Sequence, residues 1–476
     1  VEGTICYTGD ITDPNETKYT LDYYVKKAKE LESLGVHIFT IKDMAGLVKP
    51  YAAKKLISAL KEELNIPVNL HTHDSTGNGV STLLMASEAG LDIADCAIGS
   101  MSSMTSNPCM NSLVEALKGT ERDTGLNPDE LTELSQYYAR IRPIYKQFES
   151  GMDAPNTEIY KYEIPGGQYS NLLAQVKEMG AAEDFEEIKG LYKDANQLLG
   201  NIVKVTPSSK VVGDFAIFMF KNGLTKENIL EVGKDLSYPD SVVEYFEGMI
   251  GQPEGGFPEE LQKIVLKDKK PIDVRPGSLL PDEDFDYIAK GLKENFYTEN
   301  MEDPDVLSQK TLSYALYPKV YEDYCRHFEA YNDVTGLESH VYFYGLRKGE
   351  ETTLKLDEGK YLIIKFIDMT EPDEDGYRLL DFEVNGSIRE IKVLDKNLEV
   401  KTDRRVKADK SNPAHLGSTI PGTVGKVLVN EGDEVTVNMP LMTVEAMKME
   451  TTVVSTVNGK VDKIYVKEGE QVNQED

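Results

Sequence analysis

The stretch HIFTIKDMAGLVKPYAAKKLISALKEELNIPVNLHTHD, residues 37–74, contains two short apolar runs separated by a helical pattern. The runs, His37–Ile41 and Pro67–Leu70, have the length and composition of buried strands. Similar runs precede and follow them at intervals of about 30 residues, at Thr4–Thr8 and Ile93–Ile98. Strands that alternate with helices in this way predict a parallel sheet.

These four βα units predict part of a larger closed fold. Polar residues follow the carboxyl ends of the strands, where (β/α)8 barrels place their active sites. The segment Leu21–Leu34 carries its apolar residues on one helical face. A closed barrel needs eight units, so we expect the other half to lie outside this chain or to come from another one. The chain opens at Val1 with no methionine and no signal-peptide core, which we interpret as a start inside a strand.

The middle of the chain divides into three parts that differ in their predicted secondary structure. Residues 125–290 lose the strand pattern and are rich in helical patterns, whereas residues 291–401 are mixed. Residues 402–413 are charged and end in proline, which predicts a linker. In the mixed region we expect strands at Val341–Tyr344, Thr352–Leu356, Tyr361–Ile367 and Arg389–Val393.

An internal repeat marks residues 414–476. Gly422–Val435 matches Gly459–Val472, 37 positions later, and each copy alternates apolar and polar residues before a Glu-Gly turn. Such a repeat predicts a small all-β sandwich, or flattened barrel, with quasi-twofold symmetry. The counterpart of Leu441–Glu445 falls beyond Asp476, so we expect the last strand of the second copy to be absent from the chain.

Composition narrows the classes of function. The chain has 476 residues, or roughly three domains at about 150 residues each. It carries 52 basic and 82 acidic residues, and the net charge of −30 argues against nucleic acid and anionic membrane surfaces as partners. No run of about 18 apolar residues occurs, so we expect no transmembrane helix. Four scattered cysteines without a CxxC pair exclude a disulfide scaffold and suit a reducing cytoplasm.

The hexapeptide EAMKME, residues 445–450, lies between the two copies of the repeat, where we expect an exposed hairpin tip. One interpretation of Lys448 is a surface lysine between two packing methionines. The other is a lysine that a ligase modifies with a swinging cofactor. The motif resembles the carrier signature of biotin-dependent carboxylases, since lipoyl carriers usually lack the flanking methionines. The resemblance implies that a biotin protein ligase attaches biotin covalently to Lys448.

The tetrapeptide His71-Thr72-His73-Asp74 ends a predicted strand. Because side chains alternate along a strand, both imidazoles are expected on one face. This arrangement suits a transition-metal site that needs further ligands, and a hydrogen-bonding pair is the alternative. Lys42 ends the preceding strand, where it is either an ordinary salt-bridging lysine or, once CO2 converts it to an anionic carbamate, a metal ligand.

Three motifs on successive units, Thr8–Asp10, Lys42–Gly46 and His71–Asp74, resemble the carboxyltransferase domain of the pyruvate carboxylase family. The resemblance implies that Lys42, as N6-carboxylysine, binds a divalent zinc or manganese ion together with His71 and His73. An aspartate ligand and two arginines of the family lie on strands that this chain lacks. The strand at residues 4–8 accordingly resembles the fifth of eight.

Two motifs farther along resemble the same family, which implies a helical cap over the barrel mouth. Thr206, in the motif VTPSSK of residues 205–210, is then expected to shuttle a proton between biotin and substrate. The residues implied to line the biotin pocket are Gln168, Ser209 and Lys210. Without the resemblance, residues 206–209 are read as a helix N-cap or turn.

The resemblance covers nearly the whole chain and implies a complete domain order. Residues 1–124 would be the second half of the barrel, 125–290 its cap, 291–401 a tetramerisation and allosteric domain, 402–413 a linker and 414–476 the biotin carrier. The implied reaction transfers a carboxyl group from carboxybiotin to pyruvate and gives oxaloacetate, in a cytoplasmic homotetramer that serves anaplerosis and gluconeogenesis. No phosphate-binding P-loop occurs in the sequence, so ATP and Mg are expected to act in a part that precedes Val1.

Two other interpretations stay open. One is the α subunit of an oxaloacetate decarboxylase or of a transcarboxylase, which share the barrel and the metal site. Lys210 stands where decarboxylases usually carry glutamine, and the linker lacks their Pro/Ala-rich composition. The other is a non-catalytic biotin carrier and assembly fragment, which would hold no zinc or manganese. We also expect the 476-residue chain alone to lack the overall carboxylase activity.

Overall fold

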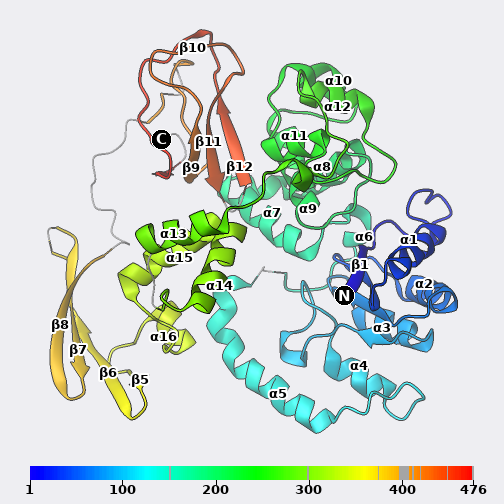
Figure 1. Ribbon diagram of the computed structural model, residues 1–476, viewed down its shortest axis with the longest axis horizontal. Helices are drawn as coiled ribbons and strands as arrows, with labels where there is room; N and C mark the ends of the chain where they lie inside the picture. Colours follow the sequence, from blue (N-terminus) through cyan, green and yellow to red (C-terminus); the bar gives the residue numbers. More distant parts are fainter. Residues whose placement is uncertain are drawn as a thin grey trace. The chain divides into compact units, whose positions relative to one another are not determined.

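The computed structural model describes residues 1–149, 152–296, 300–373, 375–395, 407–409, 412–418, 420–446 and 449–473. The chain divides into two units, whose elements are traced in Figure 1. The first consists of Val1–Pro276 with Arg405–Asp476, and the second of Gly277–Arg404. The finer domain bounds expected from the sequence stay predictions.

Four strands at the start of the chain form a parallel sheet in the order β1-β2-β3-β4. A helix follows each strand, which confirms the four predicted βα units and makes this part half of a (β/α)8 barrel (Figure 1). The elements are β1 (Glu2–Cys6), α1 (Leu21–Ser33), β2 (Ile38–Asp43), α2 (Pro50–Glu63), β3 (Val68–Thr72), α3 (Gly79–Glu88), β4 (Ile93–Ala94) and α4 (Met110–Leu117).

The two faces of this sheet differ because side chains alternate along each strand. Phe39, Ile41 and Leu70 are fully buried in a core that they share with the surrounding helices. The opposite face carries polar residues, among them Thr40 and Asn69. This polar face is the inner surface of the half-barrel, and the candidate site lies at its carboxyl end.

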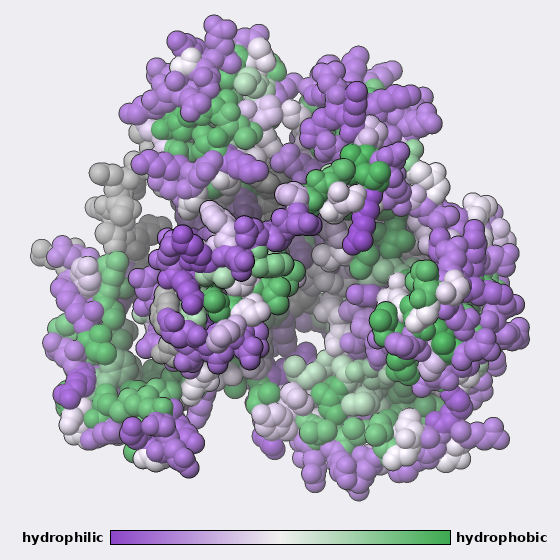
Figure 2. Space-filling model, in the orientation of Figure 1, coloured by the Kyte–Doolittle hydropathy of each residue, from purple (hydrophilic) through white to green (hydrophobic). Residues whose placement is uncertain are grey.

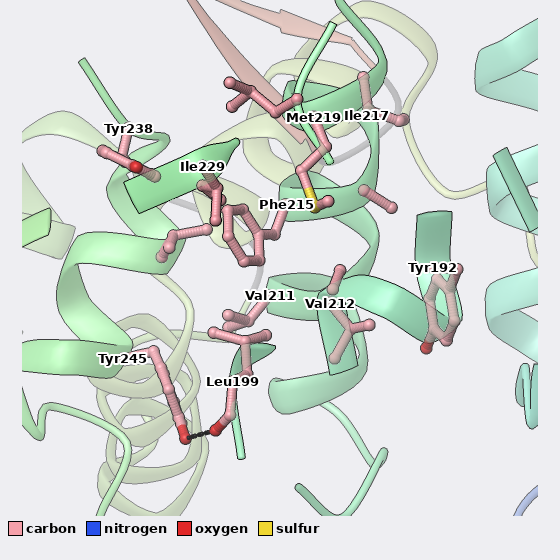
Figure 3. Close-up of a cluster of buried hydrophobic side chains, with 14 of the residues drawn as sticks. Tyr192, Leu199, Val211, Val212, Phe215, Ile217, Met219, Ile229, Tyr238 and Tyr245 are labelled. Atoms are coloured by element: carbon pink, nitrogen blue, oxygen red, sulfur yellow. Dashed lines mark hydrogen bonds between the residues drawn. The ribbon is translucent and has the colours of Figure 1, made fainter. Parts of the chain in front are cut away.

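A helical cap follows the half-barrel and has its own hydrophobic core. Its central helix, α9, buries residues on most of its sides, as expected for a helix that is apolar nearly all round. Figure 3 shows Phe215 of this helix among the core side chains, and a hydrogen bond of 2.7 Å from the Tyr245 hydroxyl to the carbonyl oxygen of Leu199. The helices are α5 (Pro128–Ile141), α6 (Ile159–Tyr162), α7 (Gly166–Glu178), α8 (Phe185–Leu198), α9 (Ser208–Lys221), α10 (Ile229–Val232), α11 (Asp240–Glu247) and α12 (Glu259–Leu266).

Hydrogen bonds join the cap to the loop that follows β1. The Lys18 ammonium donates to the carbonyl oxygen of Gly200 at 2.7 Å, and the Tyr19 hydroxyl donates to that of Asn201 at 2.7 Å. The chain segment that leads into α9 is therefore held against the carboxyl end of β1.

The second unit combines four helices with an antiparallel sheet of order β5-β6-β7-β8. Three of the four predicted strands are confirmed, in β5, β6 and β8. The sequence analysis missed β7, whose run YRLLDFEV has no strict alternation of apolar and polar residues. The elements are α13 (Phe285–Asn295), α14 (Pro304–Leu316), α15 (Pro318–Tyr331), α16 (Ser339–Tyr344), β5 (Glu351–Asp357), β6 (Lys360–Met369), β7 (Tyr377–Val384) and β8 (Ser387–Leu394).

The strand predicted at Val341–Tyr344 is wrong, because these residues end helix α16. The Gly345 amide donates to the carbonyl oxygen of Val341 at 2.9 Å, as in a helical turn. A four-residue apolar run has too little periodicity to separate helix from strand.

Apolar side chains are exposed on the sheet of the second unit. Ile363, Ile388 and Ile391 are 44%, 59% and 48% exposed. Figure 2 shows hydrophobic residues at the surface over these strands. A surface of this kind suits a contact with another protein surface.

The carrier segment, which follows the predicted linker, forms two small sheets, β10-β13 and β12-β11-β9-β14. Gly422 pairs with Val472, and Gly459, its counterpart 37 positions later, pairs with Val435. Each copy of the repeat therefore completes the other, which confirms the predicted quasi-twofold symmetry. Most of the linker lies outside the described residues. The strands are β9 (Gly422–Val427), β10 (Glu434–Val435), β11 (Pro440–Ala446), β12 (Met449–Val454), β13 (Gly459–Lys460) and β14 (Gln471–Val472).

Among the described residues, the structure contains no helix with both the length and the apolar character needed to span a bilayer.

Candidate active site

Strand register brings the predicted metal ligands together on the inner face of the half-barrel. Lys42, near the end of β2, is the register partner of His71 on β3. His73 lies two residues beyond His71, and the two imidazole rings have centroids 5.5 Å apart. All three side chains are partly buried. Both histidines thus share one face with Lys42, as strand alternation predicts, whereas their role as metal ligands stays a prediction.

Both histidines use the same ring nitrogen for a protein contact. His71 Nδ1 lies 2.8 Å from Asp95 Oδ2, and His73 Nδ1 lies 2.7 Å from the carbonyl oxygen of Thr105. A carbonyl or carboxylate oxygen accepts, so Nδ1 of each ring carries a proton, and in the neutral form of the ring Nε2 is the nitrogen that can bind a metal. Burial lowers the pKa of His73 and favours its neutral form, which is the form that binds a metal.

Whether these residues can bind a metal ion depends on the chemical form of Lys42. In the part of the chain that the structure describes, no three His, Cys, Asp or Glu side chains form a cluster that suits a metal. Two neutral imidazoles are too few for a zinc or manganese ion, and an ammonium repels one. As a carbamate, Lys42 supplies an anionic oxygen beside His71, so the donor set fits a divalent metal in that form.

The turn after Lys42 is held by the opposite face of β2. The Asp43 carboxylate accepts hydrogen bonds from the amides of Leu47 and Val48, both at 2.8 Å, and from the Thr72 hydroxyl at 2.9 Å. Asp43 is fully buried, and burial raises its pKa. Gly46, at φ +70°, passes so close to β3 that a Cβ there would lie 2.6 Å from the carbonyl oxygen of His73. These contacts explain the motif Lys-Asp-Met-Ala-Gly.

A polar layer continues below the candidate ligands. The Glu2 carboxylate accepts from the Thr40 hydroxyl and, at 3.3 Å, from the side-chain amide of Asn69. Asn69 also reaches Asp95 at 3.4 Å, and Asp95 holds His71. A carboxylate that receives the second nitrogen of an imidazole fixes the orientation of the ring.

Helix α7 begins directly at this mouth. The Gly166 amide lies 3.4 Å from the carbonyl oxygen of Met44, which follows β2. A Cβ on Gly166 would meet Thr105 Cβ at 3.3 Å and Ser75 Oγ at 3.4 Å, so only a small residue fits there. Two residues later, Gln168 is buried and lies against Gly213 of α9.

The turn before α9 presents Thr206. Its side chain is exposed, whereas Ser209 is buried and Lys210 is partly buried. The Ser208 hydroxyl accepts from the Val205 amide at 3.1 Å and lies 2.6 Å from the carbonyl oxygens of residues 203 and 205. The Ser208 hydroxyl thus makes the side-chain hydrogen bonds described for this turn, and the Thr206 hydroxyl takes no part in them.

The structure therefore assembles two groups of predicted residues, one on the barrel strands and one on α7 and the α9 turn. Lys448, predicted to carry biotin, lies outside the described residues.

The structure adds four residues that no motif predicted. Asp95 and Thr105 hold the two imidazoles, and the Lys204 ammonium pairs with Glu163 Oε2 at 2.6 Å. Asp95 lies inside the strand predicted at Ile93–Ile98, and a carboxylate within an apolar run is a usable signal. Thr105 contributes only a backbone oxygen, and Glu163 and Lys204 are paired by the fold, so no spacing reveals them.

Three family models match the chain. An HMGL-like model matches residues 11–137, one described as a conserved carboxylase domain matches residues 159–365, and one described as a biotin-requiring enzyme matches residues 413–476.

Individual relatives extend the match along the chain. The pyruvate carboxylase of Bacillus subtilis is 50% identical over 452 residues, which cover 95% of this chain and 39% of that protein. The pyruvate carboxylase of Staphylococcus aureus is 47% identical over 453 residues, which cover 95% of this chain and 39% of that protein. The carboxyl transferase domain of Rhizobium etli pyruvate carboxylase, at 43% identity and a TM-score of 0.78, matches 83% of this chain and 65% of its own. The chain spans about two fifths of the length of the curated relatives that it matches.

The order of the three models, from barrel to biotin-requiring domain, defines a biotin-dependent carboxylase. Within this class, identities of 50% and 47% along 95% of the chain point to a single family. Along 95% of its length the chain is similar to the pyruvate carboxylases of these two organisms.

Proposed function

We propose that this chain transfers a carboxyl group from carboxybiotin to pyruvate and gives oxaloacetate, the second half-reaction of ATP-dependent pyruvate carboxylase. The observation that supports the proposal most directly is the shared inner face of Lys42, His71 and His73, with both Nδ1 atoms already engaged. The Rhizobium etli domain, 43% identical to this chain, has been solved with pyruvate and biocytin, which supports pyruvate as the substrate.

Lys42, as N6-carboxylysine, His71 Nε2 and His73 Nε2 would hold the metal, zinc or manganese. When bound, the metal acts as a Lewis acid that polarises the keto group of pyruvate, and biotin brings the carboxyl group. Asp95 and the Thr105 carbonyl keep the two imidazoles oriented.

The cap residues would carry out the proton transfer and bind biotin. Thr206 Oγ1 is exposed beside the α9 turn, so it is available to take a proton from the methyl carbon of pyruvate and pass it on. Gln168 and Ser209, buried on neighbouring helices, and Lys210 would line the biotin pocket. Lys448 is the proposed site of biotin attachment.

The wider assembly is proposed from the family. A homotetramer is proposed from the resemblance, and the exposed apolar sheet of the second unit supports a contact with another protein surface. Attachment of biotin requires a biotin protein ligase. ATP and Mg would act outside this chain, in a cytoplasmic enzyme of anaplerosis and gluconeogenesis.

An assay on the natural protein that contains this chain tests the proposal. Oxaloacetate formed from pyruvate, bicarbonate and ATP is measured by coupling to malate dehydrogenase, with and without avidin. We expect avidin-sensitive formation that depends on ATP. The variants His71→Ala and His73→Ala are expected to lose both this activity and bound zinc or manganese, measured by elemental mass spectrometry.

The same experiment separates the alternatives. A decarboxylase would form no oxaloacetate from pyruvate, bicarbonate and ATP. A non-catalytic carrier would contain no zinc or manganese, and alanine at both histidines would change nothing. The relatives described above are pyruvate carboxylases, which favours the carboxylase.

A further inference from the structure

Lys204 buries a positive charge beside the candidate site. Its side chain is 2% exposed, and it lies two residues before Thr206. A charge is expensive to bury unless it is paired and hydrogen-bonded, so the contacts of this ammonium identify its structural role.

The ammonium joins three segments that are distant in the sequence. Its Nζ donates to Glu163 Oε2 at 2.6 Å and to Thr8 Oγ1 at 3.3 Å. Thr8 follows β1, and its backbone is anchored in turn, since its amide and carbonyl oxygen lie 2.9 and 2.8 Å from the Tyr24 hydroxyl. Glu163 comes three residues before the start of α7. One charge thus connects the barrel mouth, the start of α7 and the turn before α9.

The geometry around Glu163 is specific to this contact. Glu163 adopts φ +55° and ψ +37°, a left-handed conformation that few residues other than glycine adopt. Its amide closes helix α6 at 2.7 Å from the carbonyl oxygen of Ile159. Its side chain is 30% exposed, so water still reaches the carboxylate.

A buried ion pair stabilises a fold little compared with apolar residues of the same size, and in some proteins such a pair selects one geometry. The geometry selected here is that of Val205–Ser209, the segment that carries Thr206.

We propose that Lys204 and Glu163 form a positioning pair that fixes Thr206 Oγ1 relative to the barrel mouth. The inference rests on the proposed function of the chain. The pair does not touch substrate. It acts through the turn, so its loss is expected to slow turnover more than it weakens substrate binding.

The natural protein that contains this chain serves for the test, with the variants Lys204→Met, Glu163→Gln and both together. Each single variant should lower kcat by about 10- to 100-fold, because a small misplacement of a reacting group is that costly. The KM for pyruvate should stay within about 2-fold, and the double variant should be no slower than the worse single one, because the two residues act as a unit.

A second measurement does not depend on activity. Amide hydrogen exchange at residues 205–209 should speed up in each variant, with unchanged exchange in α8 and α11. Unchanged exchange in α8 and α11 shows that the fold of the cap is preserved in a variant, so a loss of kcat in that variant reports on the position of the turn.

The chain offers a matched control in Lys189. Its side chain is 4% exposed and pairs with Glu158 at 2.7 Å and Glu186 at 2.6 Å, yet it contacts neither the α9 turn nor Thr8. Lys189→Met should leave kcat and exchange at residues 205–209 unchanged.

Unchanged kcat in Lys204→Met and Glu163→Gln, or faster exchange at residues 205–209 in Lys189→Met as well, would overturn the inference. Failure of the proposed function can be distinguished from failure of this inference. In that case the unmodified protein would form no oxaloacetate, and hydrogen exchange would still report whether the pair fixes the turn.

Discussion

At the scale of single residues, the proposed metal ligands of the half-barrel are easier to predict from the sequence than the groups that orient them. The shared face of His71 and His73 follows from strand alternation, whereas Lys42 was predicted as the third ligand from the family resemblance. Asp95 meets His71 only because β4 pairs with β3 in one particular register. The Thr105 oxygen arrives by a loop whose path no local pattern encodes. The candidate ligands can therefore be predicted from the sequence, whereas the groups that orient them are identified only in the structure.

The contact between Asp95 and His71 leads to a first prediction. Asp95→Asn removes the charge that holds the Nδ1 proton of His71, so metal affinity should fall by about 10- to 100-fold. Competition with a coloured chelator measures the change. Asp22→Asn, an exposed change of the same size in helix α1, is the control and should leave the affinity unaltered.

Gly46 gives a second prediction because two effects act on it together. Gly46→Ala places a Cβ at φ +70° and 2.6 Å from the carbonyl oxygen of His73. Gly35, at φ +86°, has no atom within 4 Å of such a Cβ. Gly35→Ala should cost about 1 kcal/mol of unfolding free energy from backbone strain alone.

Gly46→Ala should cost clearly more than Gly35→Ala and also weaken metal binding, because the backbone of a ligand must shift. Thermal unfolding and the chelator assay measure the two effects. Equal stability losses in the two variants would contradict the close approach of Gly46 to β3.

At the scale of elements, the strongly periodic segments were predictable. The helix predicted at Leu21–Leu34 is observed at Leu21–Ser33. The strand predicted at Ile93–Ile98 ends at Ala94, because residue 97 leaves the sheet to bond with Pro108. Segment Val341–Tyr344 was predicted as a strand because aromatic and β-branched residues favour strands, and a run of four residues is too short to show helical periodicity.

The contact between helices α7 and α9 gives a third prediction. A Cβ on Gly213 would overlap the side-chain amide of Gln168, so Gly213→Ala should displace Gln168. The KM for free biotin in biotin-stimulated oxaloacetate decarboxylation should rise, with little change in the KM for oxaloacetate.

Gly190 of α8 is the matched control for that change. It also lies inside a helix, but a Cβ added to it would meet no atom within 4 Å. Gly190→Ala should raise stability by about 0.5–1 kcal/mol through helix propensity and leave both KM values unchanged. A biotin KM that is unaffected by Gly213→Ala would argue against Gln168 in the pocket.

At the scale of the whole molecule, the carrier gives a fourth prediction. Lys448→Arg keeps the charge and removes the amine that a biotin protein ligase modifies. The mass increment of biotin and all ATP-dependent oxaloacetate formation should disappear, while thermal unfolding stays the same. Lys467→Arg, in the second copy of the repeat, should retain full biotinylation. Biotin found on the Lys448→Arg protein would show that another lysine is the carrier.

The link between Lys204 and Thr8 spans 196 positions of the chain, and those from Lys18 and Tyr19 to the same cap segment span 182. A ribosome that adds about 5–20 residues per second needs about 10–40 s to cover that distance. The last of the three proposed ligands, His73, precedes Thr206 by 133 residues, so all three are made about 7–27 s before the turn that carries Thr206. During synthesis the proposed ligands of the half-barrel are therefore complete before the cap residues with which they are proposed to act.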